Sequence, residues 1–241
     1  MKGTRSDFHG QFFLATSLVG LCMLAVMTFL SPSPETIPPW QAPVVNSLFV
    51  LICLSGIVAG ISPSTCSSLF GSLAGHREHT TIAMPSPNAT GEKKGHHPDC
   101  GSFSMHTFQF RGKTYCAGCT GLVIGAVVSI LGTVAYFILA PQWGQTGWLL
   151  FWLGFLGVSL GLLQHGLRIF RKNYAHGLLG VTFVFGAFLV FIGIEEISNN
   201  LIVEGYFLVL SLFWIVTRVI LSQEEHRRIC DECGRSDCGF T

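Results

Sequence analysis

The stretch that decides the fold is residues 121–140, GLVIGAVVSILGTVAYFILA, in which 20 consecutive positions carry no charged side chain. A helix rises about 1.5 Å per residue, so this stretch spans about 30 Å, the thickness of the hydrocarbon core of a bilayer. Other apolar stretches approach the same length. They are residues 12–30, 44–61, 147–167, 174–194 and 201–217. The sequence therefore predicts an all-α integral membrane protein with six transmembrane helices.

The composition of the whole chain indicates the same class. Hydrophobic residues make up 49% of the 241 positions and charged residues only 11%, which is too little polar surface to coat a soluble globule. The formal net charge is +1, so nothing indicates nucleic acid as a partner. We expect the lipid bilayer to be the main partner. The first stretch is longer than the apolar part of a signal peptide, and we interpret it as a retained helix.

The segments between the apolar stretches alternate in charge. Residues 31–43, 141–146 and 195–200 contain no Lys or Arg, whereas all 14 basic residues fall in the other segments, on one side of the membrane. Cytoplasmic loops are the ones that carry an excess of Lys and Arg. We therefore expect a multi-pass protein of the cell membrane with both termini in the cytoplasm.

These segments divide the chain into five parts. The long basic segment changes composition near His96: the part before it is rich in Ser, Thr, Gly and Pro, and the part after it interleaves aromatic and polar residues around a turn at 111–113. The predicted division is 1–61 for the first two spans, 62–95 for a flexible cytoplasmic linker, 96–120 for a Cys/His module, 121–221 for four further spans and 222–241 for a Cys-rich tail.

The Cys/His module reads as a small β-hairpin closed by a metal knuckle. So short a segment cannot form a core alone, but a bound metal contributing on the order of 10 kcal/mol would fold it. Cys-x-x-Cys and His-x-x-Cys pairs supply tetrahedral ligands that favour zinc, with iron as the alternative. The predicted ligands are Cys100, Cys116, Cys119 and His97, with His106 or His96 as substitutes for the histidine. A redox dithiol at Cys116 is less favoured because no thioredoxin-like pattern surrounds it.

The C-terminal tail carries a second group of possible ligands. Cys230 and Cys233 form another Cys-x-x-Cys pair, which His226 and Cys238 could complete as a compact metal loop. Alternatively, the tail pair joins Cys116 and Cys119 in one all-cysteine site, because both motifs are expected on the same face of the membrane. A charged tail with reduced thiols is the third interpretation.

Part of the Cys/His module resembles a known family. The matching residues are the run His96-His97-Pro98-Asp99-Cys100, then His106, Gly112-Lys113 and Cys116-Ala117-Gly118-Cys119-Thr120-Gly121-Leu122. They resemble uncharacterised archaeal and bacterial multi-span membrane proteins that carry a Cys/His pair, a short hairpin and a Cys-Ala-x-Cys-Thr-Gly motif at a helix entrance. The resemblance covers about 30 residues, and the family has a Cys-His pair where this chain has His97-x-x-Cys100. It implies an integral membrane protein and no particular activity.

The spans themselves offer weaker signals. G-x-x-x-G pairs begin at Gly56, Gly121 and Gly157, and such faces allow close helix packing within the chain or against other membrane subunits. No Asp, Glu, Lys or Arg is expected near the centre of a span, which weakens a proton-coupled transporter. Other polar residues lie near span ends. We interpret the acidic ones as solvated interface carboxylates, with a weak cation contact as the alternative, and the histidines as interfacial, with a haem pair as the alternative; they are Glu195, Glu196, Glu204, His165 and His176.

The function that these patterns favour is a membrane scaffold, assembly factor or sensor with a cytoplasmic zinc site. No nucleophile, base and orienting residue can be assembled from the sequence, so an enzyme is disfavoured. Two alternatives stay open. One is a membrane oxidoreductase that uses the thiols or a haem, and the other is a metal-ion transporter that receives ions from the cytoplasmic thiols.

Overall fold

The structure, a computed structural model, describes residues 4–32, 34, 36–61, 107–111, 113–139, 146–167 and 173–233. Its helices are α1 (Thr4–Leu30), α2 (Gln41–Ile61), α4 (Ala117–Leu139), α5 (Thr146–Leu167), α6 (Asn173–Ile197) and α7 (Leu201–Cys233). Each contains a segment long and apolar enough to cross a membrane, which gives six candidate spans in the described part of the chain. The prediction of a six-span, multi-pass membrane protein is confirmed as far as the number, length and apolar character of the helices are concerned.

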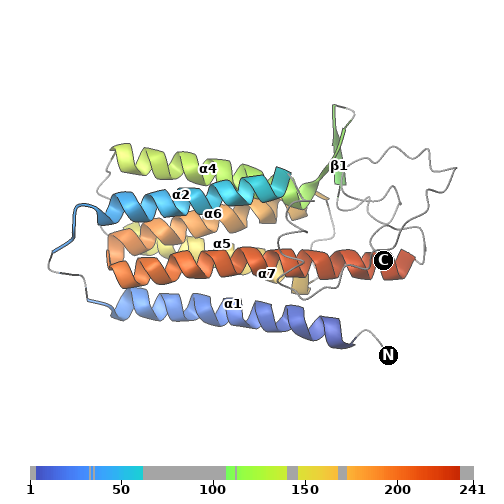
Figure 1. Cartoon of the computed structure of the whole chain (residues 1–241), viewed down its shortest axis with the longest axis horizontal. Coiled ribbons are helices and arrows are strands. Elements are labelled where there is room, and N and C mark those ends of the chain that lie inside the picture. Colours follow the sequence, from blue (N-terminus) through green and yellow to red (C-terminus); the bar gives the residue numbers. More distant parts are fainter. Residues whose placement is uncertain are drawn as a thin grey trace, which may run out of the picture.

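The helices form one bundle with their axes roughly parallel (Figure 1). The start of α1 and the end of α7 lie at the end of the bundle that carries the short strands, and the connections α1–α2 and α6–α7 lie at the opposite end. We call these the hairpin end and the loop end. The strands are β1 (Thr107–Phe110) and β2 (Lys113–Cys116), which pair in antiparallel register with Thr107 opposite Cys116. Their turn lies at the residues where the sequence predicts one, and Arg111 in it has a φ of 51°.

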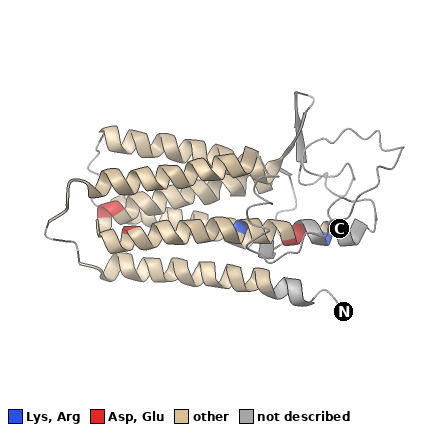
Figure 2. Cartoon of the chain, in the orientation of Figure 1, with Lys and Arg blue, Asp and Glu red and all other residues tan. Residues whose placement is uncertain are grey.

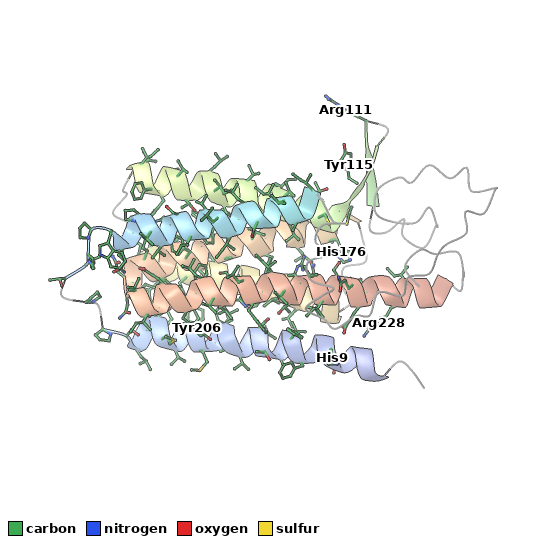
Figure 3. All side chains as sticks on the ribbon, viewed as in Figure 1. His9, Arg111, Tyr115, His176, Tyr206 and Arg228 are labelled. Carbon is green, nitrogen blue, oxygen red and sulfur yellow. The ribbon has the colours of Figure 1, made fainter. Side chains whose placement is uncertain are left out.

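Large apolar side chains cover the outside of the bundle (Figure 3). Exposed examples include Met23 on α1, Leu51 on α2, Leu131 on α4, Leu153 on α5 and Val209 on α7. A soluble monomer rarely exposes contiguous apolar surface on this scale. A bilayer is the solvent that such a surface requires.

Helix α6 is the centre of the bundle and packs against α4 and α5 most extensively. Half of its candidate span is buried, more than for any of the other described spans. Its Phe191 stacks on Phe49 of α2 and on Phe207 of α7, with ring centroids 4.9 and 5.6 Å away, and the Phe49 and Phe207 rings also contact each other at 5.9 Å. Trp214 continues this aromatic core along α7, 6.2 Å from Phe207.

Glycines let α6 approach its neighbours to backbone contact. A Cβ on Gly125 of α4 would lie 3.1 Å from the Val181 backbone, and one on Gly157 of α5 would lie 3.0 Å from the Thr182 carbonyl oxygen. Gly121 similarly faces the Gly177 carbonyl. These members of the predicted G-x-x-x-G pairs therefore pack within the chain. Gly56 differs, because nothing described lies within 4 Å of its Cβ position.

Helices α1 and α7 are joined by a ladder of polar contacts. The Tyr206 hydroxyl donates to the Gly20 carbonyl at 3.2 Å, and the Ser17 and Thr217 hydroxyls share a hydrogen bond of 2.9 Å. Nearer the hairpin end, the Gly10 amide donates to the Glu224 carboxylate at 3.0 Å. Interhelical hydrogen bonds of this kind contribute about 0.6 to 2 kcal/mol each in a membrane. They fix α1 against α7, although α1 packs little against the rest of the bundle.

The last helix differs most from the sequence prediction. The predicted span ends at residue 217, but α7 continues to Cys233 and its candidate span to Glu225. Residues 222–233 include Gln, Glu and Arg, which favour helix, and no Gly or Pro before Gly234. The compact loop predicted for the tail is therefore wrong over residues 226–233, which are helical.

Candidate functional site

The predicted knuckle lies where the hairpin becomes a transmembrane helix. Cys116 is the last residue of β2 and Ala117 the first of α4, so Cys119 falls in the first helical turn. Both thiols are half-buried. The Thr120 hydroxyl donates to the Cys116 carbonyl at 2.8 Å and holds the junction in a tight turn. The structure thus brings Cys116 and Cys119 to one short junction at the hairpin end.

The other predicted ligands are not described as side chains. His97, Cys100, His106 and Cys238 lie outside the described residues, and His226, Cys230 and Cys233 are described only as positions in α7. Among the described residues, no three side chains of His, Cys, Asp or Glu come close enough to hold a metal ion. The described residues therefore do not form the predicted zinc site, and they do not test it, because most of its predicted ligands are not described as side chains.

A buried arginine near this junction was missed by the sequence prediction. Arg218 of α7 is only 6% exposed and lies inside a candidate span. Its guanidinium donates to the Gly161 carbonyl of α5 at 2.7 Å and lies 5.3 Å from the Phe183 ring of α6. The prediction that Arg218 follows the last span is wrong. The missed signal is the apolar run at residues 219–221, which continues the span beyond the arginine.

Arg218 also connects the thiol junction to the core. Its guanidinium lies within electrostatic range of the Glu225 carboxylate and of the Cys119 thiol. An arginine inside a bundle is expensive unless several partners satisfy it. Arg218 therefore ties α5, α6 and α7 together beside the first turn of α4.

A second polar group lies at the loop end, where Figure 2 shows acidic residues but no Lys or Arg among the described residues. Gln41 of α2 donates to the Glu204 carboxylate at 3.1 Å and to the Asn199 carbonyl at 3.2 Å. The Asn46 amide donates to Glu195 at 3.3 Å, and the Tyr136 hydroxyl to Glu196 at 2.7 Å. We call Gln41, Asn46, Glu195, Glu196, Asn199 and Glu204 the loop-end cluster.

The carboxylates of the loop-end cluster are more buried than the solvated interface carboxylates that the sequence predicts. Glu204 is 1% exposed, and Glu195 and Glu196 are partly buried. Helix α2 packs near the α6–α7 connection, so Gln41 covers Glu204. Polar groups that the sequence predicts at the membrane surface therefore lie inside the bundle. The interpretation of Glu204 as a solvated carboxylate is wrong. Gln41 was missed as the partner of Glu204 and Asn46 as the partner of Glu195, since amides in an apolar stretch give no distinctive pattern.

The isolated cysteines and histidines give little further information about function. Cys53 is buried in the apolar core, as expected of a small apolar residue, and Cys22 is exposed on α1. His176 lies in the first turn of α6, and the side chain of His165 is not described. Neither the interfacial interpretation of these histidines nor the alternative of a haem pair is tested by this geometry.

No protein family, curated protein or solved structure matches this chain. The resemblance noted for the Cys/His module therefore stays a prediction. What the fold defines is a class, the multi-pass α-helical membrane proteins.

Proposed function

We propose that this chain is a multi-pass protein of the cell membrane whose hairpin and tail cysteines bind zinc at the cytoplasmic face, and that it serves as a scaffold, assembly factor or sensor rather than as an enzyme. Iron is the alternative metal. The observation that supports this most is the direct passage from β2 into α4 with a thiol on each side. Metal bound there would lie at the membrane surface and hold the hairpin to the helix.

Local electrostatics support metal binding at this junction. Cys119 lies in the first turn of α4, where the unpaired backbone amides give a helix its positive end. Arg218 adds a second positive charge that interacts with Cys119. Thiolates, not thiols, ligate zinc, and positive surroundings favour the thiolate. The junction therefore suits a pair of zinc-binding thiolates.

Helix packing beside the junction favours a sensor among the three roles. A Cβ on Gly180 of α6 would lie 3.2 Å from the Gly118 carbonyl, so the backbones of α4 and α6 touch within the Cys116–Cys119 turn. Metal that reshapes this turn must therefore shift or tighten the α4–α6 contact. Close-packed interfaces transmit such changes because they contain little space to absorb them.

The helical end of α7 is compatible with its residues contributing ligands to the proposed zinc site. The end of α7 and the hairpin lie at the same end of the bundle (Figure 1). Positions 226, 230 and 233 of the helix are separated by four and three residues, the spacing that recurs on one side of a helix. Residues 226, 230 and 233 could therefore supply three ligands to one metal ion from a helix, without the compact loop that the sequence predicts.

Metal analysis of the purified full-length chain tests the proposal. We expect about one zinc ion per chain if hairpin and tail share a site and about two if they do not. Replacing Cys116 by serine should remove at least one of them, because serine does not replace a thiolate ligand for zinc. Inductively coupled plasma analysis provides the count.

Cys22→Ser is the matched control, since Cys22 is exposed on α1 rather than at the hairpin junction. It should keep the metal content of the parent. Equal zinc in the parent and the Cys116→Ser variant would refute the site. A haem absorbance, a dithiol that cycles with disulfide, or metal flux into vesicles would instead favour the oxidoreductase or the transporter.

Cysteine labelling tests the proposed orientation. Arg111 in the hairpin turn (Figure 3) and Trp40, which directly precedes α2 at the loop end, are both exposed. In intact cells, a membrane-impermeant maleimide should label Trp40→Cys above the parent background. Arg111→Cys should be labelled only after permeabilisation. The reverse pattern would place the hairpin outside the cell and contradict the positive-inside assignment.

A further inference from the structure

The loop end buries carboxylates, and the described residues there include no Lys or Arg to balance them. In the sequence, the segments that connect α1 to α2, α4 to α5 and α6 to α7 contain no Lys or Arg; they are residues 31–40, 140–145 and 198–200. Arg218 lies fourteen residues beyond Glu204 in the same helix, about 21 Å away. Glu195 also experiences the charges of Glu204 and Glu196. In a low-dielectric interior such a group needs a cation or a proton.

The end of α6 adds negative potential at the same place. Glu195 and Glu196 lie in the last turn of α6, which ends at Ile197 and has no basic residue there. The C-terminus of a helix is its negative end, where carboxylates are unfavourable and cations favourable. Asn199 follows with a φ of 43°, which directs its carbonyl to Gln41 rather than into a further helical turn. This helix end is thus arranged to receive positive charge.

Two buried oxygens in the loop-end cluster have no hydrogen-bond donor among the described residues. They are Asn46 Oδ1 and Glu195 Oε2. Asn46 is 6% exposed, and its nitrogen donates to the Ala42 carbonyl at 2.7 Å and to Glu195 Oε1 at 3.3 Å. Both partners are acceptors, so these hydrogen bonds fix which amide atom is the nitrogen. The oxygen is left as an acceptor beside a carboxylate that also has an unused acceptor.

We propose that Glu195 and Asn46 bind a hard metal cation of the Na⁺ or Ca²⁺ class at the loop end. A cation that reaches both unpaired oxygens would satisfy them and would balance the carboxylate at the negative end of α6. Oxygen ligands select hard cations, and neutral amide and carbonyl oxygens beside one or two carboxylates are typical of their sites. In transporters, the C-terminal ends of half-helices and unwound backbone carbonyls coordinate such ions near the bilayer midplane, which shows that a helix C-terminus can take part in a cation site. The site differs in chemistry from the thiol junction, which favours zinc.

Thermal unfolding of the detergent-purified chain tests this site. The buffer contains choline chloride, which is replaced stepwise by NaCl at constant ionic strength, and a second series adds CaCl₂. We expect one of the two cations to raise the unfolding midpoint by about 5 °C or more at roughly 100 times its dissociation constant. The same cation, added as a radioactive tracer, should bind at saturation with a stoichiometry of one ion per chain.

Variants of the two ligands separate a cation site from a general salt effect. Glu195→Gln keeps the shape of the side chain and should reduce the cation-dependent shift to about 1 °C or less, while making the cation-free protein more stable. Asn46→Asp adds a carboxylate and should enlarge the shift. Glu224→Gln, which removes a carboxylate at the hairpin end, is the matched control and should retain the shift of the parent.

Two results would overturn the site. The first is the same salt dependence in the parent, Glu195→Gln and Glu224→Gln. The second is a parent stabilised by acidic buffer but by neither cation, which would show that a proton, not a metal ion, balances Glu195.

Discussion

Replacing Gly154 by alanine lowers the stability of the folded bundle by about 3 kcal/mol, at the upper end of the usual cost of overpacking. Gly154 lies on α5 where it meets α6. The added Cβ would lie 2.5 Å from both the Gly186 carbonyl oxygen and the Val190 amide nitrogen. These are backbone atoms on a helix, so they cannot rotate away as a side chain does. The two helices must separate and lose the contacts around them.

Unfolding of purified protein by a denaturing detergent, followed by circular dichroism, measures this effect. Gly56→Ala is the control because its Cβ would have nothing within 4 Å among the described residues. Alanine also has the higher helix propensity, so this variant should be as stable as the parent or slightly more stable. If both variants unfold at the same detergent fraction, the backbones of α5 and α6 do not approach each other closely enough at Gly154 to exclude a Cβ.

Replacing Arg218 by alanine has the second large expected effect, again about 3 kcal/mol of lost stability. The guanidinium spans three helices, with its hydrogen bond to the Gly161 carbonyl and its contact with the Phe183 ring. Removing it loses both contacts and leaves a void in the bundle. Lysine should retain part of the stability, because its single ammonium replaces the charge but not the planar fork of donors.

The same unfolding assay measures the series Arg218→Lys and Arg218→Ala. Arg228→Ala is the matched control, since Arg228 is an exposed arginine ten positions further along the same helix. Its effect should stay within about 0.5 kcal/mol, as for most surface substitutions. An Arg218→Ala variant as stable as Arg228→Ala would show that the buried guanidinium does not hold the bundle together.

The sequence by itself determined the number and the approximate limits of the spans. Twenty apolar residues such as 121–140 can satisfy their backbone in a bilayer only as a helix. The hairpin turn at Arg111 was also local information, because interleaved aromatic and polar residues flank it and the strands pair there. Both features depend on neighbours in the chain, which a sequence records directly.

Only the tertiary structure decided which polar groups are interior. Arg218 and Glu204 lie three or more turns apart on α7 and look like residues near the ends of a span, yet α5 and α6 enclose one and α2 covers the other. Asn46 reaches Glu195 across 149 positions of the chain. Burial is set by which helices become neighbours, and in a bundle whose helices are all apolar the hydrophobic pattern does not specify the neighbours. Glycine contacts and buried hydrogen bonds do so, and they are visible only once the helices are packed.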